Sequence, residues 1–315
     1  MQIVLDSCRQ VVAQSRHVSL DQEALARFAP ELALSKVPRW EGRYHFSGEP
    51  ERLAHYLLLL DALNFCFWPE PRWAIDYQGE KISGYWALAA ALKRAFEQHS
   101  SLEDLQQLIK ITPDQLRSIL GGTGEIPLLD ERAQILRELG QVLHEKFQGQ
   151  AARLFQAASG SAVELVRLLT SHFPSFRDRA TYRGQPVYFY KRAQILAADL
   201  HEASGAEGQG ALPDVDLLTA FADYKLPQVL RHLGILRYDE RLAERVDARR
   251  ELPAGSPEEI EIRAHTVWAV ELLRREMERR DTRLHSFELD RLLWHLGQRD
   301  EFRAKPYHRT LTIYY

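Results

Sequence analysis

The sequence predicts a mostly α-helical protein with a compact multi-helix fold and a few short β-hairpins. Three observations predict this fold class. Apolar residues recur at the spacing of an amphipathic helix along most of the chain. Serine or threonine followed three residues later by an acid precedes several of these segments, a pattern typical of helix starts. The 315 residues are 45% hydrophobic and 27% charged, as in ordinary globular proteins, which argues against wholesale disorder.

The first strong helical pattern covers residues 53–63, where leucines and a tyrosine share one face. Pro69 and Pro71 follow, and proline stops a helix because it lacks the backbone N–H group. Residues 73–77 and 80–83 are joined by a Gln-Gly pair, which favours a tight turn. We therefore expect a helix followed by a short hairpin.

Residues 86–96 and 127–147 also have helical spacing. In residues 101–104 an acid follows a serine by three positions, which predicts a helix capped by Ser101. Ser161 and Glu164 repeat this pattern before an apolar run, so we expect a capping box there.

Residues 180–190 are less helical, and an Arg-Gly-Gln turn in their middle favours a second hairpin. A helix is expected over residues 191–202, followed by a glycine-rich loop at 205–210. These glycines follow a helix rather than a strand, which argues against a dinucleotide-binding motif. Residues 216–233 have a helical pattern that we expect to be interrupted at Leu226-Pro227.

Ser256-Pro-Glu-Glu259 is a strong helix start, because serine caps, proline suits the first position and Glu259 can close a capping box. That helix should run to about Arg280. Ser286 is expected to cap a last helix through Leu296. The tail at residues 311–315 is apolar and aromatic, so we expect it to be docked on the protein.

The chain has no internal repeat and no Pro/Ser-rich linker, which favours one continuous domain over residues 1–315, with room for two lobes around a cleft. The N-terminus lacks a signal-peptide pattern, and no apolar run approaches the roughly 20 residues that span a bilayer. Cys8 and Cys66 do not have metal-site spacing and fit a reducing compartment. We therefore expect a cytoplasmic protein with no membrane partner.

The formal net charge is −3, from 41 basic and 44 acidic residues. Binding to polymeric DNA or RNA usually needs a basic excess that neutralises phosphates, so no polymeric nucleic acid is expected as partner. A small phosphorylated ligand needs only a few local cations and remains compatible with this charge.

Asp223 is the most unusual acidic residue, because it follows the apolar run at residues 218–222. Burying a lone carboxylate costs free energy and shifts its pKa, which is one way to make a catalytic base. The alternative is that Asp223 caps the next segment or pairs with Lys225 or Arg231. The residue types alone favour this alternative.

Other polar residues in apolar sequence are further candidates. Asp199 lies in an apolar helical segment after Lys191 and Arg192, and an internal salt bridge is the alternative explanation. Asp290 with Trp294, and Arg291 with His295, have the spacing of neighbours on one helix face. These side chains can bind a polar ligand together. Alternatively they form an ordinary surface ladder, that is, a row of solvent-exposed polar contacts along the helix.

Six aromatic residues accompany these acids and can stack on a flat heterocycle, although aromatics at helical spacing are usually core: Phe65, Phe67, Trp68, Phe221, Tyr224 and Trp294. The sequence has no phosphate-binding glycine loop, no metal-type histidine pair and no nucleophile elbow. Residue chemistry alone therefore indicates a helical protein with buried-looking carboxylates, compatible with an enzyme acting on a polar, ring-containing small molecule.

Several longer segments resemble the queuosine salvage protein family, from near residue 40 to the C-terminus. They are residues 63–68, 190–199, 218–228, 261–263 and 308–315. The resemblance implies a helical fold similar to that of DNA glycosylases and an enzyme that needs no cofactor. It also implies hydrolysis of the N-glycosidic bond of queuosine 5′-monophosphate, which releases queuine for reuse in tRNA.

The resemblance also implies site residues. The family's catalytic carboxylate falls on Asp223, and its ligand contacts fall on His45, Phe221, Asp290, Arg291 and His295. The family pattern has Asp-Tyr and a later Asp at these positions. This chain has Asp290-Arg291 and His295 there, so it departs from the pattern at Arg291 and His295. The secondary amine of queuine is expected to pair with Asp199 or Asp290. The 5′-phosphate requires cations, and the candidates are Lys191, Arg192, Lys225 and Arg231.

Two alternative functions remain open from the sequence. The first is a glycosylase that acts on a base in DNA or RNA, which the slightly acidic charge disfavours. The second is a queuosine-binding protein without catalytic activity.

Overall fold

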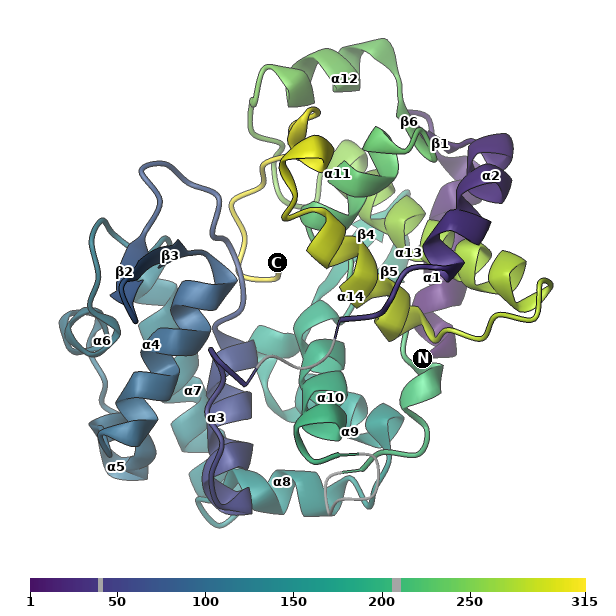
Figure 1. Ribbon diagram of the computed structural model, residues 1–315. Coiled ribbons are helices and arrows are strands. Elements are labelled where there is room, and N and C mark those ends of the chain that lie inside the picture. Colours follow the sequence, from purple (N-terminus) through teal and green to yellow (C-terminus); the bar gives the residue numbers. More distant parts are fainter. Residues whose placement is uncertain (39–41, 206–210) are drawn as a thin grey trace.

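The computed structural model describes residues 1–38, 42–205 and 211–315, and helices dominate it, as predicted (Figure 1). The strands form two-stranded antiparallel sheets. They pair β1 (Val18–Leu20) with β6 (Leu236–Tyr238), β2 (Ala74–Tyr77) with β3 (Glu80–Ser83), and β4 (Arg179–Tyr182) with β5 (Gln185–Tyr188). Apart from Gly205, the predicted glycine-rich loop lies outside the described residues.

The helices up to the middle of the chain are α1 (Gln2–Gln14), α2 (Gln22–Ala33), α3 (Pro50–Ala62), α4 (Tyr85–Glu97), α5 (Leu105–Leu108), α6 (Pro113–Leu120) and α7 (Leu129–Lys146). Those that follow are α8 (Ala151–Ala157), α9 (Ala162–His172), α10 (Lys191–Ala203), α11 (Lys225–His232), α12 (Glu240–Asp247), α13 (Pro257–Glu278) and α14 (Ser286–Leu296). Short 3-10 helices cover Ser101–Glu103, Pro174–Phe176, Val215–Leu217 and Asp300–Arg303. None of the described helices is long and apolar enough to cross a membrane.

The buried apolar residues form three clusters. The largest joins α3, α4, α7, α9 and α10, and the run Leu57 to Leu60 of α3 is completely buried in it. The second joins α2, α11, α13 and α14, and the third packs α1 on β4, β5 and α13. Figure 1 shows α3 to α7 on one side of the molecule, α11 to α14 on the other, and the C-terminal segment between them. Whether this arrangement is one domain stays a prediction.

Both hairpins occur where the sequence predicts them. Gln78 and Gly79 connect β2 to β3 with positive φ angles of 50° and 82°, and Arg183 and Gly184 connect β4 to β5 with 48° and 80°. Two successive left-handed residues match the right-handed twist of the strands, which explains the glycine at each second position.

Two predicted caps are shifted. Ser101 begins a 3-10 helix, and the carboxylate of Asp104 accepts hydrogen bonds from the first N–H groups of the one-turn helix α5. Ser286 is the first residue of α14, and Glu288 closes that helix start by accepting a bond from the N–H of His285 at 2.7 Å. The caps thus lie one residue before the predicted serine at α14 and three residues after it at α5.

The other two caps are confirmed at their serines. Ser161 accepts the N–H of Glu164, but the Glu164 carboxylate bonds to Arg167 instead of closing the box. Ser256 accepts the N–H of Glu259, and α13 then runs to Glu278, close to the predicted end.

The prediction of an interrupted helix over residues 216–233 is wrong. Residues 218–224 are not helical, and α11 begins at Lys225. Asp223 Oδ1 accepts the N–H groups of Lys225 at 2.8 Å and Leu226 at 2.9 Å, which caps the new helix. Pro227 lies in the first turn, where its missing N–H is not needed. The predicted interruption is therefore a helix start.

The C-terminal tail is docked, as predicted. The hydroxyl of Tyr315 donates to Glu259 of α13 at 2.9 Å, and the carbonyl oxygen of Tyr315 accepts the N–H of Cys66 at 2.9 Å. Tyr315 is 2% exposed. The tail thus joins the α13 side of the molecule to the segment after α3.

Candidate active site

A cavity of about 460 Å³ opens between α10, α14, the start of α4, the segment 218–224 and the loop after α3. This volume is typical of sites that enclose a small organic ligand. Eight of the predicted site residues line it: His45, Lys191, Asp199, Phe221, Asp223, Asp290, Arg291 and His295.

Asp223 presents one carboxylate oxygen to the backbone and the other to the cavity. Oδ1 is held by the two N–H groups at the start of α11, and Oδ2 has no hydrogen bond within the described part of the chain. Burial raises the pKa of this carboxyl, whereas the Lys191 ammonium and the helix N–H groups lower it. Asp223 is therefore both the cap that the residue types favoured and a carboxylate that faces the cavity.

Asp290 fixes the segment that carries Phe221. Its Oδ2 accepts the N–H of Phe221 at 2.7 Å, which ties α14 to the non-helical residues before Asp223. The side chain is only 6% exposed, so the surface-ladder alternative is wrong. Burial, and next the charge of Asp223, raise the pKa of Asp290 well above its usual range, which favours the protonated form.

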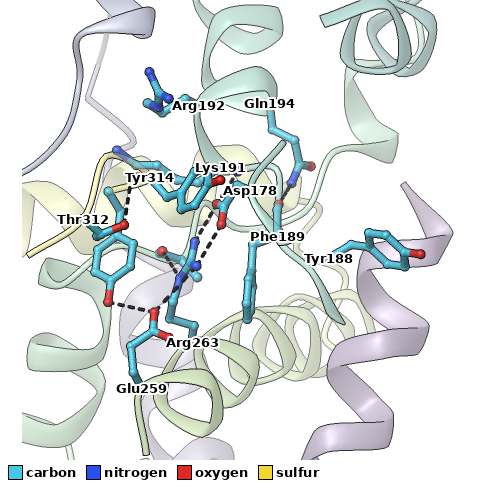
Figure 2. A network of polar contacts seen from close by, with 12 residues as sticks. Asp178, Tyr188, Phe189, Lys191, Arg192, Gln194, Glu259, Arg263, Thr312 and Tyr314 are labelled. Carbon is cyan, nitrogen blue, oxygen red and sulfur yellow. Dashed lines mark hydrogen bonds and ion pairs between the residues drawn. The ribbon is translucent and has the colours of Figure 1, made fainter. Parts of the chain in front are cut away.

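A buried ion pair positions the start of α10 and the chain before Asp223 (Figure 2). Arg263 donates to both oxygens of Asp178 at 2.9 and 2.6 Å, and through Nε to the carbonyl of Ala222 at 3.2 Å. Asp178 also accepts the N–H of Lys191 at 3.2 Å. Figure 2 shows Glu259 on the other side of Arg263 from Asp178. The distance from Glu259 Oε1 to Arg263 Nη1 is 3.7 Å. The network thus fixes the backbone of Lys191 and the chain next to Asp223.

The ammonium of Lys191 is buried in the cavity wall. Nζ donates to the carbonyl of Asn64 at 3.1 Å. Burial lowers the pKa of Lys191, and Asp223 is the largest influence that raises it again. No ion pair joins Asp199 to Lys191 or Arg192 in the described ranges, so the predicted alternative for Asp199 is not what the structure shows.

One end of the cavity is aromatic. His45 and the Tyr85 hydroxyl share a hydrogen bond of 2.8 Å, and Trp86 and Trp294 meet edge to face at 5.4 Å. His295 packs against both tryptophans. Sequence reasoning missed Tyr85 and Trp86. Their only signal was their place at the start of a predicted helix directly after a hairpin.

Asp199 lies toward this aromatic end. It is half-buried, and burial raises its pKa to about 8, while the guanidinium of Arg291 opposes this shift. Arg291 itself is paired with Glu202 and donates to the carbonyl of Pro38 at 3.2 Å.

A second part of the cavity wall, here called the cationic end, carries positive charges. Arg72, Lys225 and Arg303 line it, and Lys225 Nζ lies 5.3 Å from the centre of the Tyr307 ring. Burial, and next the nearby Arg303, lower the pKa of Lys225 to about 8. Sequence reasoning missed both arginines, because Arg72 follows a proline-rich loop and Arg303 lies beyond the last predicted helix.

Three sequence candidates lie elsewhere. Arg192 donates to the carbonyls of Ala62 and Ser175, and Arg231 forms an ion pair with Asp247 at 2.6 Å. Neither lines the cavity, so both are wrong as phosphate ligands. Trp68 donates to the carbonyl of Thr310 at 3.1 Å and is a packing residue, whereas Phe65 and Phe67 do line the cavity.

Residues 44–315 match the model of a protein family described as queuosine salvage protein. The chain belongs to the queuosine salvage protein family. A Sphaerobacter thermophilus member named queuosine 5′-phosphate N-glycosylase/hydrolase is 54% identical over 99% of this chain and 97% of the relative. A Mus musculus member with the same name is 36% identical, covering 98% of each chain. A Schizosaccharomyces pombe member with that name is 33% identical over 80% of this chain and 76% of the relative.

Proposed function

We propose that this member of the queuosine salvage family hydrolyses the N-glycosidic bond of queuosine 5′-monophosphate and releases queuine. The relatives' shared name supports the reaction. One observation of the structure carries it furthest: the buried carboxylate of Asp223 is held through one oxygen, while its other oxygen faces a cavity of small-molecule size. We also propose that the protein works in the cytoplasm on the free nucleotide, since its net charge of −3 does not favour polymeric nucleic acid.

Asp223 is the proposed catalytic residue. Breaking the bond between the sugar and the base leaves an oxocarbenium-like sugar, and a carboxylate beside it stabilises that positive charge or activates the attacking water. Water supplies the oxygen that joins the sugar carbon, and the base leaves with the bonding electrons and takes up a proton. The helix N–H groups hold Asp223 in place, so little reorganisation is needed.

Asp290 and the cavity aromatics are proposed to bind the base. A deazaguanine base is a poor leaving group, so a donor that bonds to it as negative charge develops helps the reaction. Asp290 is suited to this because burial beside Asp223 raises its pKa well above its usual range, which favours the protonated form. Two carboxyl groups in one cavity with different protonation states are a common arrangement for acid-base work. The ring of Phe221 is proposed to stack on the base.

The 5′-phosphate is proposed to bind at the cationic end. Arg72, Lys225 and Arg303 come from three separate segments and converge there. Lys225 Nζ has no carboxylate partner within the described part of the chain, and it donates to the carbonyl of Gly297 at 3.1 Å. An incoming phosphate dianion would relieve the mutual repulsion of these cations.

Arg303→Met is expected to raise the KM for the nucleotide by about 10-fold to 100-fold, because it removes one charged hydrogen-bond donor from the phosphate. Steady-state kinetics on the nucleotide and on the unphosphorylated nucleoside measure this. The matched control is Arg299→Met, whose exposed side chain is outside the cavity. An equal loss on both substrates would contradict a role in phosphate binding.

Lys191→Met is expected to move the acidic limb of the pH profile of kcat/KM to higher pH. The Lys191 charge lowers the pKa of Asp223, so its removal raises that pKa further. Activity that needs ionised Asp223 is lost as the pH falls through this pKa, and the limb therefore appears at higher pH. At a pH on the acidic limb, the rate should fall by about 10-fold for each pH unit by which the limb moves up, because the ionised fraction of Asp223 falls by the same factor. Lys110→Met, on the exposed surface, is the control, and an unshifted limb in Lys191→Met would argue against the coupling.

Incubation of the purified protein with three substrates tests the function. They are queuosine 5′-monophosphate, an oligonucleotide that contains queuosine, and an unmodified oligonucleotide, with free base read by mass spectrometry. Release from the mononucleotide alone supports the proposal. Release from an oligonucleotide supports a DNA or RNA glycosylase, and tight binding without release supports a non-catalytic binding protein.

A further inference from the structure

Three buried acceptor atoms of two aspartates near Tyr85 have no hydrogen-bond partner in the described residues. They are both carboxylate oxygens of Asp61 and Oδ2 of Asp199. Asn64 lies close to Asp61, but neither Asp61 oxygen has a contact with hydrogen-bond geometry. Buried acceptors are rarely left without donors, because each lost bond to water costs about 1 to 3 kcal/mol. This group of oxygens therefore indicates a donor that arrives with a ligand or with solvent.

The two aspartates differ in their access to the cavity. Asp61 of α3 is completely buried and does not line the cavity, whereas Asp199 of α10 does. Their charges interact, and burial raises the pKa of both. The charged or titratable groups near Asp199 come from four helices: Lys191 and Glu202 of α10, Arg291 of α14, Tyr85 of α4, and Tyr56 and Asp61 of α3.

Asp290 is less suited to a new cationic group. Its Oδ2 is already bonded to the N–H of Phe221, and it lies next to Asp223, where the base is cleaved. Arg291 is already paired with Glu202. Among the carboxyls of the described cavity wall, Asp199 is thus the one whose unpartnered oxygen is completely buried, whereas the free oxygen of Asp223 is needed beside the bond that is cleaved.

We propose that Asp199, backed by Asp61, is an ammonium-binding subsite that selects substrates whose base carries a cationic amine. This inference rests on the proposed function, since the secondary ammonium of the queuine side chain is the group that would bind there. An ammonium supplies N–H donors, together with its positive charge, to acceptors that have no donor within the described residues. The cavity wall would then offer the cations Arg72, Lys225 and Arg303 to the phosphate and the carboxyl of Asp199 to the amine.

Binding of an ammonium at this subsite is expected to release a proton. At neutral pH the Asp199 carboxyl of the empty cavity is mostly protonated, since its pKa is about 8. A bound ammonium favours the ionised form, so binding releases a proton. Calorimetry of queuine binding in two buffers of different ionisation enthalpy measures this release. Asp199→Asn cannot ionise, and because it resembles the protonated acid it is expected to fold normally.

The deciding experiment compares two substrates, queuosine 5′-monophosphate and the 5′-monophosphate of unsubstituted 7-deazaguanosine, which lacks the amine. In Asp199→Asn the ratio of kcat/KM for the cationic over the neutral substrate is expected to fall by about 10-fold to 100-fold. Asp61→Asn should lower the ratio in the same direction, and the exposed Asp76→Asn should leave it unchanged. An unchanged ratio in Asp199→Asn, or an undiminished proton release, would overturn the subsite.

Binding measurements separate this inference from the proposed function. Queuine and 7-deazaguanine can be titrated into the wild type and Asp199→Asn without any turnover. If the wild type prefers queuine and the variant does not, the subsite stands even for a protein that hydrolyses neither nucleotide. Equal binding of both bases by the wild type would overturn the subsite while leaving the hydrolysis intact.

Discussion

Asp223→Asn is expected to reduce queuine release by at least about 1,000-fold, the scale seen when a group that stabilises transition-state charge is removed. The amide is neutral, so it neither stabilises an oxocarbenium-like sugar nor activates water. The fold should survive, because asparagine caps a helix as well as aspartate does and the N–H groups of Lys225 and Leu226 keep an acceptor. Product formation under single-turnover conditions measures the loss.

Asp216→Asn is the control for this variant, since Asp216 is an exposed acid a few residues upstream and does not line the cavity. It should release queuine at the wild-type rate. Thermal unfolding of both variants should match the wild type. Full turnover by Asp223→Asn would remove this carboxylate from the mechanism.

Asp178→Ala is expected to destabilise the protein by about 3 to 5 kcal/mol, because it leaves the buried Arg263 guanidinium without its bidentate partner. Arg263 is 3% exposed, so water cannot replace the lost carboxylate. The first turn of α10 also loses the acceptor for the N–H of Lys191. Denaturant unfolding monitored by circular dichroism gives the change in free energy.

Glu164→Ala provides the comparison for a solvated ion pair. Glu164 binds Arg167 through two hydrogen bonds, but the Arg167 side chain is 61% exposed. Its loss should change the unfolding free energy by about 1 kcal/mol or less. If Asp178→Ala costs no more than Glu164→Ala, the Asp178–Arg263 pair does not hold the site in place.

The sequence was sufficient for most of the helices, and the eight main site candidates that it indicated all line one cavity, although their roles stay a prediction. Residues whose elements follow from local patterns, such as the Ser256 cap and the Gln-Gly hairpin turn, were predicted correctly. Residue chemistry singled out Asp223 as unusual, but it favoured a cap over a catalytic role, and only the family resemblance indicated the latter. The structure shows that a cap and a cavity-facing carboxylate are compatible, since different oxygens serve each.

What local patterns missed depends on contacts between distant segments. The helical spacing over residues 216–233 did not reveal that Asp290, far along the chain, bonds to the backbone of Phe221 and that residues 218–224 are not helical. Arg72 and Arg303 lie in loops without a motif, and only the fold brings them to Lys225. Arg192 and Arg231 illustrate the opposite error, because buried carbonyls and Asp247 already satisfy them.

The central claim is that this cavity hydrolyses the bond between the base and the sugar of queuosine 5′-monophosphate. The most direct measurement is product analysis by mass spectrometry after reaction in water enriched in heavy oxygen. The account predicts free queuine and ribose 5-phosphate that carries one heavy oxygen from water. Three results would contradict it: free queuine with a sugar product that lacks heavy oxygen, a sugar product transferred to another acceptor, or no cleavage at all.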